Sequence, residues 1–380
     1  MQLLLCHCRS DIQNILALYS IIFYSPCSPR TEINIPTWFV TELISMEKPV
    51  DFQNKEDQEL LLTLPRVKSW DFPYLYQYQG FWYATKYLHG IISFQKHFQA
   101  KDTDIILATF PKSGTIWLKT LTFNIVNRSR YTSENTPLLT KSPHDLVPFL
   151  DIHIYGRNQS STLEDLPTPR TLATHLPYSS LPPSIISSNC RIVYLCRNPL
   201  DQFISYWHFA PKIRNQAIME PISIDEAFEM LCQGVQCFGP IWDHMLGYWK
   251  ASLEKPDKIL FLKYEDLQED IISCLKKLAD FLGYPFTDEE EIRGVIEEIS
   301  KFSSFDNMKN LELNQFGTLA SSGIENKMFF RKGKVGDWTN YLSPSMSKRL
   351  EKVMAEKLGQ SPGLMTFKFS QTSTAQSNIE

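Results

Sequence analysis

The sequence lacks an excess of basic residues. Its 380 residues include 38 lysines and arginines against 42 aspartates and glutamates, so the formal net charge is −4 at pH 7. A protein that binds nucleic acid over a broad surface would carry a basic excess. We therefore expect no nucleic-acid partner, and any anion site in this chain must be built from a few local cations.

Metal and disulfide patterns are also missing. The eight cysteines form no Cys-x-x-Cys pair and no cysteine–histidine cluster with zinc spacing, so we expect no metal site. Glycine, with 15 residues, is too scarce for a fibrous chain. The cysteine usage favours a reducing, cytoplasmic location. Four cysteines lie among apolar residues and are predicted to be buried thiols: Cys190, Cys196, Cys232 and Cys274.

No apolar run is long enough to cross a bilayer. Residues 15–24 are apolar, but a membrane-spanning helix needs about 20 such residues, and no basic start or Ala-x-Ala site marks a secretory signal. We expect no membrane partner. Residues 1–45 are predicted to be an N-terminal extension, disordered or absent from the native protein. Residues 46–63 form a polar lead-in from Met46, and residues 371–380 are expected to fray.

From about Leu64 onward, short apolar segments alternate with amphipathic ones. This alternation predicts one α/β domain over residues 64–370, with a central parallel sheet flanked by helices. Residues 306–334 have little regular pattern and are predicted to form a lid. Strands are expected at Asp104–Phe110, Arg191–Cys196 and Lys258–Lys263, and helices at Ile116–Asn127, after Asn198-Pro199, near Asp270–Leu282 and from Asp288.

The segment Thr109–Trp117 joins a predicted strand to a predicted helix. Free N–H groups and the helix dipole at such a junction attract an anion, and Lys112 adds a full charge. Gly114 permits a close backbone approach. The segment is not a Walker A loop, because its lysine precedes the glycine. We predict a P-loop-like nucleotide site, although the segment alone is equally compatible with an ordinary turn.

Three further segments carry candidate functional residues. Arg197 follows a strand, at the sheet edge where open α/β sheets bind ligands, and Ser205 lies about two turns into the next helix. Residues 331–338 hold three cations and two glycines, which indicates either a phosphate clamp or a solvated face. His175 lies in a Thr-His-Leu-Pro segment. A lone histidine of this kind is more often structural than catalytic.

Together these four segments resemble the cytosolic sulfotransferases over residues 64–370. The family pattern is T-x-P-K-S-G-T-T-W, T-H-L-P, Y-x-x-R-N-P-x-D…S-x-x-H-F and R-K-G-x-x-G-D-W, and all four parts occur here in that order. The chain resembles the plant branch of this family at residues 144–149, 173–178 and 340–344. Residues 79–82 and 93–98 are similar to those of plant hydroxyjasmonate sulfotransferases.

The resemblance implies transfer of a sulfuryl group from 3′-phosphoadenosine 5′-phosphosulfate (PAPS) to a hydroxyl of a small molecule. His175 would then be the general base, and a neutral imidazole suits that role. Lys112 would stabilise the leaving phosphate, and Ser205 completes the implied catalytic set. The 5′-phosphate would lie on Ser113, Gly114, Thr115, Ile116 and Trp117, the 3′-phosphate on Arg197, Ser205, Arg331, Lys332 and Gly333, and the adenine against Trp117, Tyr264, Phe305 and neighbouring Ser303 and Met308.

The chain departs from the family pattern at several places. Ile116 occupies the position of a second threonine, so we expect weakened donor affinity rather than an inactive enzyme. Ala173 replaces a lysine that many animal members have. A short dimerisation motif is not recognisable near Tyr341–Arg349, which favours a monomer or a weak dimer. Three aromatic residues are candidates for the acceptor pocket, with core packing as their alternative: Phe149, Tyr178 and Phe209.

Two other functional classes remain as alternatives. A nucleotide kinase would need a lysine after the glycine of a P-loop, which the sequence lacks. A non-catalytic nucleotide-binding module would keep Lys112 and Arg197 but would not need His175. The acceptor could be hydroxyjasmonate or a flavonol, a brassinosteroid or a desulfoglucosinolate, because a few pocket side chains decide acceptor choice.

Overall fold

The computed structural model describes residues 55–157, 163–213, 222–320 and 322–359, together with Leu364 and Phe367. These residues belong to the structural unit that begins at Val50. The predicted N-terminal extension and the predicted frayed tail both lie outside the described residues. Within the described part of the chain, no helix combines the length and the apolar character that spanning a membrane requires.

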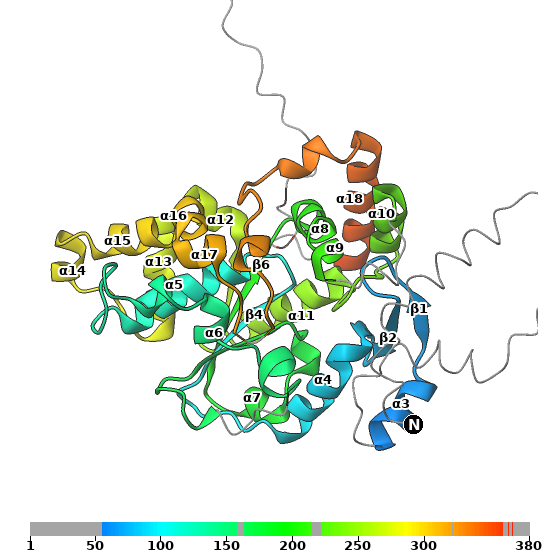
Figure 1. The fold of residues 1–380 in the computed structure, drawn as a ribbon, viewed down its shortest axis with the longest axis horizontal. Helices are drawn as coiled ribbons and strands as arrows, with labels where there is room; N and C mark the ends of the chain where they lie inside the picture. Colours follow the sequence, from blue (N-terminus) through cyan, green and yellow to red (C-terminus); the bar gives the residue numbers. More distant parts are fainter. Residues whose placement is uncertain are drawn as a thin grey trace, which may run out of the picture. The chain divides into compact units, whose positions relative to one another are not determined.

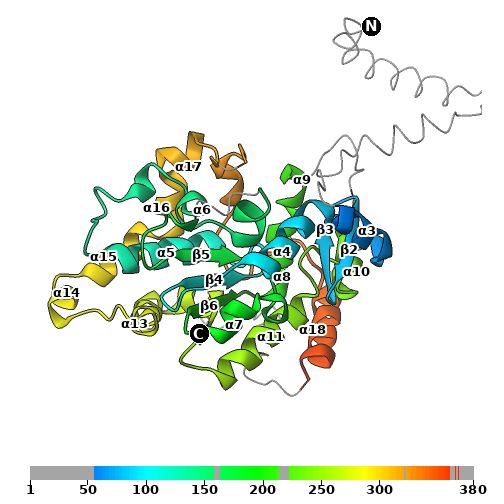
Figure 2. The same cartoon turned by 90° about the horizontal axis from the view of Figure 1, so that it is seen from below.

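A four-stranded parallel sheet forms the centre of the fold (Figures 1 and 2). Its order is β5 (Thr171–Thr174), β4 (Ile105–Thr109), β6 (Arg191–Cys196) and β7 (Ile259–Lys263). The pairing is in register along the strands, with Ile105 opposite Arg191 and Thr109 opposite Leu195. Every residue of β4 is buried, as expected for a parallel strand that is covered on both faces. The predicted fold class and the three predicted strands are confirmed.

Alternate residues of the strands pack into two separate cores, because neighbouring side chains point to opposite faces. Leu107 and Val193 lie in one core, whereas Ile106 and Ile192 lie in the other. The first core is closed by α5 (Thr115–Asn127), α13 (Ile271–Leu282) and α15 (Val295–Phe302). The second is closed by α4 (Thr85–His97), α8 (Pro199–Trp207), α10 (Ile224–Cys232), α11 (Ile241–Glu254) and α18 (Pro344–Leu358).

Side-chain caps begin several of the predicted helices. The Asn198 side chain accepts from the Leu200 N–H at 2.9 Å, and Pro199 occupies the first turn of α8. Asp270 caps α13 in the same way. Thr287 forms a capping box at the start of α14 (Asp288–Ile292), where the acidic run was expected to begin a helix. These helix starts could be predicted from the sequence because the cap residue and the apolar pattern indicate the same boundary.

A second sheet was not foreseen from the sequence. It is antiparallel and has the order β1 (Arg66–Lys68), β2 (Tyr74–Tyr78) and β3 (Phe81–Ala84). The hairpin between β2 and β3 turns through Gln79 and Gly80, which both have positive φ (52° and 85°), as a two-residue type I′ turn requires. The polar lead-in contains the helix α3 (Lys55–Thr63).

The predicted lid contains more regular structure than its sequence pattern indicated. It includes α16 (Phe305–Asn310), α17 (Glu312–Phe316) and η5 (Asn326–Phe329). These helices are too short for an apolar period to show, and local side chains stabilise them instead: the Asn314 amide donates to the Met308 carbonyl oxygen at 2.7 Å. The remaining helical segments are η1 (Pro137–Leu139), α6 (Pro143–Leu146), η2 (Leu150–Ile154), η4 (Tyr178–Ser180), α7 (Pro183–Ser187), α9 (Ala210–Ile213), α12 (Tyr264–Glu269) and η6 (Asp337–Asn340).

Most of the predicted buried thiols are confirmed. Cys190, Cys196 and Cys232 are buried, and so is Cys237, whereas Cys274 on α13 is only partly buried, so the prediction was wrong for that residue. Cys274 packs at the edge of its core rather than within it. All five of these cysteines are free thiols.

Candidate active site

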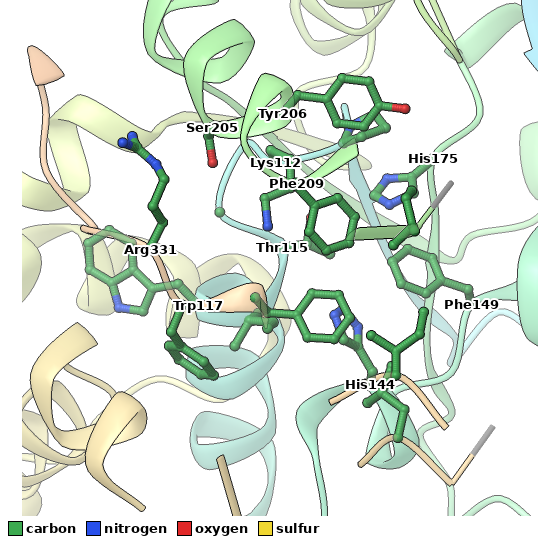
Figure 3. A pocket seen from close by; sticks show the side chains of 18 of the residues that line it. Lys112, Thr115, Trp117, His144, Phe149, His175, Ser205, Tyr206, Phe209 and Arg331 are labelled. Carbon is green, nitrogen blue, oxygen red and sulfur yellow. The ribbon is translucent and has the colours of Figure 1, made fainter. Parts of the chain in front are cut away.

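One cavity of about 560 Å³ lies at the carboxyl ends of β4, β5 and β6. It receives residues from all four sequence motifs (Figure 3). Of the predicted site residues, only Ser113 and Tyr178 are not among those that line it. The predicted residues that do are Lys112, Gly114, Thr115, Ile116, Trp117, Phe149, His175, Arg197, Ser205, Phe209, Tyr264, Ser303, Phe305, Met308, Arg331, Lys332 and Gly333.

The loop between β4 and α5 has an unusual backbone conformation. Lys112 has φ of 68° and Gly114 has φ of 103°, so the chain turns sharply before α5 begins. A Cβ atom at Gly114 would come within 2.7 Å of the Tyr264 ring, which explains why only glycine fits there. The loop therefore presents the N-terminus of α5 to the cavity, where backbone N–H groups favour an anion. Ser113 is buried beside the cavity rather than on its lining.

Lys112 reaches into the cavity beneath two aromatic rings. Its Nζ atom lies 4.1 Å from the centroid of the Phe209 ring and 5.6 Å from that of Phe329. Burial, together with the nearby cations Arg197, Lys212 and Arg331, lowers the pKa of Lys112 to about 7. Because these neighbours are all positive, a bound anion would restore the charged form of the lysine.

Arg197, at the end of β6, is held by backbone carbonyls. Its Nη2 donates to the Lys334 oxygen at 2.9 Å, and its guanidinium lies 4.5 Å from the centroid of the Tyr264 ring. Its Nε is buried and has no hydrogen-bond partner within the described structure. The same holds for Arg331 Nε, Trp117 Nε1 and Ser113 Oγ. Buried donors normally have partners, so these unpaired groups around one cavity indicate a polar ligand.

The late basic segment is a clamp organised by Asp337. Arg331 and Lys332 both donate to its carboxylate, with Lys332 Nζ at 2.7 Å. Burial raises the pKa of Asp337, but hydrogen bonds from Lys332, Arg331 and Asn340 outweigh it and lower the pKa to about 2. Asp337 therefore remains charged and fixes the two cations at the rim of the cavity.

The clamp is anchored to α8 through Asp201. This buried carboxylate accepts from the Gly336 N–H at 2.7 Å and from the Trp338 N–H at 3.1 Å. Ser205 lies one turn further along the same helix and also lines the cavity. One helix therefore carries Ser205 and positions the loop that holds Arg331 and Lys332.

Aromatic side chains line the same end of the cavity. The Trp117 and Tyr264 rings meet edge to face at 5.2 Å. Gly333 has φ of 64°, and a Cβ atom there would come within 2.4 Å of the Phe305 ring. The Tyr264 hydroxyl donates to the Gly333 carbonyl at 3.1 Å. These rings form an apolar slot beside the basic groups, and Ser303 and Met308 also line the cavity.

His175 is fixed by the strand next to its own. Its Nδ1 lies 2.7 Å from the Thr109 carbonyl oxygen, and since a carbonyl only accepts, we assign the ring proton to Nδ1. The Nε2 atom then keeps its lone pair. Burial lowers the pKa of His175 to about 3, so the ring is neutral at neutral pH. The centroid of the His175 ring lies 4.5 Å from that of Phe149 and 5.4 Å from that of Phe238.

Sequence reasoning missed the groups behind His175. His244 on α11 donates from Nε2 to the His175 carbonyl at 2.9 Å, and the Tyr194 hydroxyl donates to His244 Nδ1 at 2.9 Å. Burial lowers the pKa of His244 to about 4. No motif marks His244, because its partners are 69 and 50 residues away.

The wall opposite the basic groups also differs in part from expectation. Phe149 and Phe209 line the cavity, whereas Tyr178 does not. The Tyr178 ring instead packs 5.6 Å from Tyr248, because the turn at η4 carries it away from the end of β5. Sequence reasoning missed His144, His153 and Phe238, which do line the cavity.

Two further observations concern the predictions made from the motifs. Ile116 lines the cavity in the first turn of α5, where the anion site is predicted. Among the described residues, no three or more His, Cys, Asp or Glu side chains form a group that could hold a metal ion. The expectation that no metal takes part stays a prediction.

A cavity with this arrangement of cations, aromatic slot and neutral imidazole suits a nucleotide-like polyanion beside a second, less polar molecule. A family model described as "Sulfotransferase domain" matches residues 102–362. The chain is 49% identical to cytosolic sulfotransferase 15 of Arabidopsis thaliana over 319 residues, which cover 83% of this chain and 88% of that protein. It is 48% identical to cytosolic sulfotransferase 14 of the same plant over 321 residues, covering 83% and 91%.

Solved structures agree with these matches. An Arabidopsis thaliana putative steroid sulphotransferase superposes with a TM-score of 0.63 at 38% identity, covering 83% of this chain and 98% of that one. A mouse sulfotransferase complexed with PAP gives a TM-score of 0.60 at 26% identity, covering 76% and 96%. The chain belongs to the sulfotransferase family, in the branch of the plant cytosolic sulfotransferases.

Proposed function

We propose that the protein transfers the sulfuryl group of PAPS to a hydroxyl of a small plant metabolite. The observation that carries the proposal is that one cavity holds both Lys112 and a buried, neutral His175 whose Nε2 lone pair is available. The family membership supports a sulfotransferase, and the PAP-bound mouse relative supports an adenosine phosphate donor.

The residues present fit such a donor. The unpaired donors Arg197 Nε, Arg331 Nε and Trp117 Nε1 surround a basic cavity, and the adjoining slot of Trp117, Tyr264 and Phe305 suits a purine. Arg197, Ser205, Arg331, Lys332 and Gly333 would hold the 3′-phosphate. The first turn of α5, from Ser113 to Trp117, would hold the 5′-phosphate, with Ser113 contributing through its backbone and its buried hydroxyl.

PAPS would supply the electrophilic sulfuryl group. His175 Nε2 would accept the proton of the acceptor hydroxyl as the new oxygen–sulfur bond forms. In the same displacement the bond from sulfur to the bridging phosphate oxygen would break and the adenosine bisphosphate would leave, and Lys112 would stabilise the negative charge on its oxygen. The His244 N–H on the His175 carbonyl and the Thr109 carbonyl on His175 Nδ1 keep the imidazole in its basic orientation.

For the acceptor we propose hydroxyjasmonate first, supported by the resemblance of residues 79–82 and 93–98 to plant hydroxyjasmonate sulfotransferases. The competing acceptors are a flavonol, a brassinosteroid and a desulfoglucosinolate. The names of the Arabidopsis relatives support a cytoplasmic location. We propose a monomer or a weak dimer on the basis of the missing dimerisation motif.

Sulfate transfer from radiolabelled PAPS to each of these four acceptor classes tests the proposal. We expect transfer by the wild type and a loss of at least about a hundredfold in kcat for His175→Ala, since a general base contributes roughly that much or more. PAPS binding without transfer to any acceptor would instead support a non-catalytic nucleotide-binding module. Turnover of a nucleoside triphosphate without use of PAPS would support a nucleotide kinase.

A further inference from the structure

His144 is a second imidazole on the cavity wall, and the mechanism above does not use it. It lies on the short helix α6, lines the cavity and is only 5% exposed. Its Nδ1 atom lies 3.0 Å from Nζ of Lys119, whose side chain is completely buried on α5. A buried lysine is costly to keep, so its contact with a cavity-lining ring calls for a functional account.

The hydrogen bond between these two residues assigns the proton of the His144 ring. An ammonium group has three donors and no lone pair, so Lys119 must donate and His144 Nδ1 must accept. Burial lowers the pKa of Lys119 well below its usual value, and two contacts oppose this effect: the carboxylate of Asp151 attracts the ammonium, and Nζ lies 3.5 Å from the centroid of the Phe149 ring. On these two contacts we assign the ammonium form to Lys119. The His144 proton is then on Nε2, which makes this nitrogen of the cavity-lining ring a hydrogen-bond donor.

His144 and His175 therefore have opposite hydrogen-bonding roles at Nε2: the first donates and the second accepts. His175 keeps a lone pair on Nε2 because its Nδ1 donates to the Thr109 carbonyl, whereas His144 carries a proton on Nε2 because its Nδ1 accepts. Both rings pack on Phe149, with centroids 5.3 Å and 4.5 Å away. Figure 3 shows the Phe149 ring between them at one end of the cavity.

The lining of the cavity offers no carboxylate to compete for the His144 donor. None of the described residues that line it is an aspartate or a glutamate, whereas seven are lysines or arginines. A ligand oxygen is therefore the natural partner for an N–H that faces this space. A carbonyl or carboxylate oxygen would satisfy it, while a purely hydrocarbon ligand would leave a buried donor unpaired, which is unfavourable.

We propose that His144, positioned by Lys119, determines acceptor specificity by donating an Nε2–H hydrogen bond to a carbonyl or carboxylate oxygen of the acceptor while the acceptor hydroxyl lies at His175. The inference rests on the proposed sulfotransferase function and deepens it. His144 selects the molecule by an oxygen remote from the reacting hydroxyl, and Lys119 acts only through His144.

The tautomer of His144 tests the inference without any substrate. Heteronuclear NMR distinguishes protonated from unprotonated ring nitrogens, and the His144→Gln variant identifies the His144 signals. We expect an Nε2–H tautomer for His144 and an Nδ1–H tautomer for His175 in the wild type. Lys119→Met should remove this preference at His144, and Lys352→Met, an exposed lysine on α18, should not. An Nδ1–H form of His144 in the wild type would overturn the proposal.

Specificity is then measured with matched acceptors that differ only in the oxygen-bearing group. The first set is para-hydroxyphenylpropanoate, its primary amide and para-propylphenol, each assayed for kcat and KM. In His144→Phe we expect the preference for the oxygen-bearing members to fall about tenfold, which corresponds to roughly 1.4 kcal/mol, mainly through KM. His144→Gln, which keeps a donor, should recover part of it.

An unchanged preference in both His144→Phe and Lys119→Met, with folded protein by circular dichroism, would refute the role of His144. The outcome is separable from the fate of the proposed function. A protein that transfers no sulfate at all would contradict the function, and the NMR result would still decide whether His144 presents a donor to the cavity.

Discussion

The Nδ1 atom of His175 lies 2.7 Å from the carbonyl oxygen of Thr109. This contact joins the end of β5 to the end of β4, the strand that leads directly into the loop of Lys112. The proposed base and the proposed phosphate loop are therefore fixed to each other by a hydrogen bond from the His175 side chain to the backbone. Small displacements of either would disturb both.

The lowered pKa of Lys112 predicts that the protein takes up a proton when it binds the donor. Its pKa is lowered to about 7, so the free protein loses the lysine charge as the pH rises through that value. A bound polyanion favours the charged form, and affinity should fall by up to about tenfold per pH unit above 7. Calorimetry of PAP binding in buffers of different ionisation enthalpy measures the uptake at pH 8. Lys112→Arg should bind without it, and equal uptake by both proteins would contradict the assignment.

We expect that replacing Ile116 with threonine strengthens donor binding. A threonine at this position would add a hydroxyl in the first turn of α5, beside the proposed 5′-phosphate. One hydrogen bond to a charged group contributes about 1.5–3 kcal/mol, so Ile116→Thr should tighten PAP binding by roughly tenfold or more. Isothermal titration of PAP against the wild type and Ile116→Thr measures this. Ile116→Val is the control for shape, and an unchanged Kd for the threonine variant would show that Ile116 does not weaken donor binding.

Gly333 and Gly336 form a matched pair. Both have positive φ, 64° and 82°, but a Cβ atom at Gly333 would meet the Phe305 ring at 2.4 Å, whereas nothing lies within 4 Å of one at Gly336. Both alanine variants should lose about 1 kcal/mol or more of stability from backbone strain. Only Gly333→Ala should also weaken PAP binding, because it displaces Phe305 from the aromatic slot. Equal loss of PAP affinity in the two variants would exclude a local effect.

Because several histidines are buried in the neutral form, we expect the folded protein to lose stability in weak acid. Burial lowers the pKa of His175 and His153 to about 3 and that of His244 to about 4, from 6.5. Below pH 6.5 the unfolded chain binds protons that the folded chain does not, so stability falls as the pH drops toward 4. Among the described residues, burial raises the pKa of five carboxyls, which opposes this. Two more histidines, His144 and His208, also have lowered pKa values, and so do six carboxyls, whose contribution to stability is likewise lost on acidification. Urea unfolding across this range measures the slope, and a flat profile would contradict the burial of the neutral rings.

The sequence was sufficient to predict an element where its local pattern was clear. The apolar run of β6 and the cap at Asn198 predicted a strand and a helix whose junction carries Arg197, and the four motifs led to one cavity. It was insufficient where contacts are distant in the chain. His244 supports His175 from 69 residues away, and β5 has only four residues, too few for a pattern to reveal.

Proximity in the sequence also misled in one place. Tyr178 was grouped with the acceptor pocket because it follows the His175 motif, yet the turn at η4 carries its ring onto Tyr248. The antiparallel sheet escaped notice because most residues of β2 are only half-buried, which gives no clear alternation. Both errors arise because side-chain direction after a turn depends on packing, and packing is not local.

Asp201 has a consequence for the order in which the site can assemble. Its carboxylate on α8 holds the N–H groups of Gly336 and Trp338, so residues about 135 positions later in the chain complete the clamp. During synthesis the loop of Lys112 and the helix of Ser205 emerge long before Arg331 exists. The growing chain can therefore hold only part of its donor site, and full donor binding begins when the last third of the domain has docked.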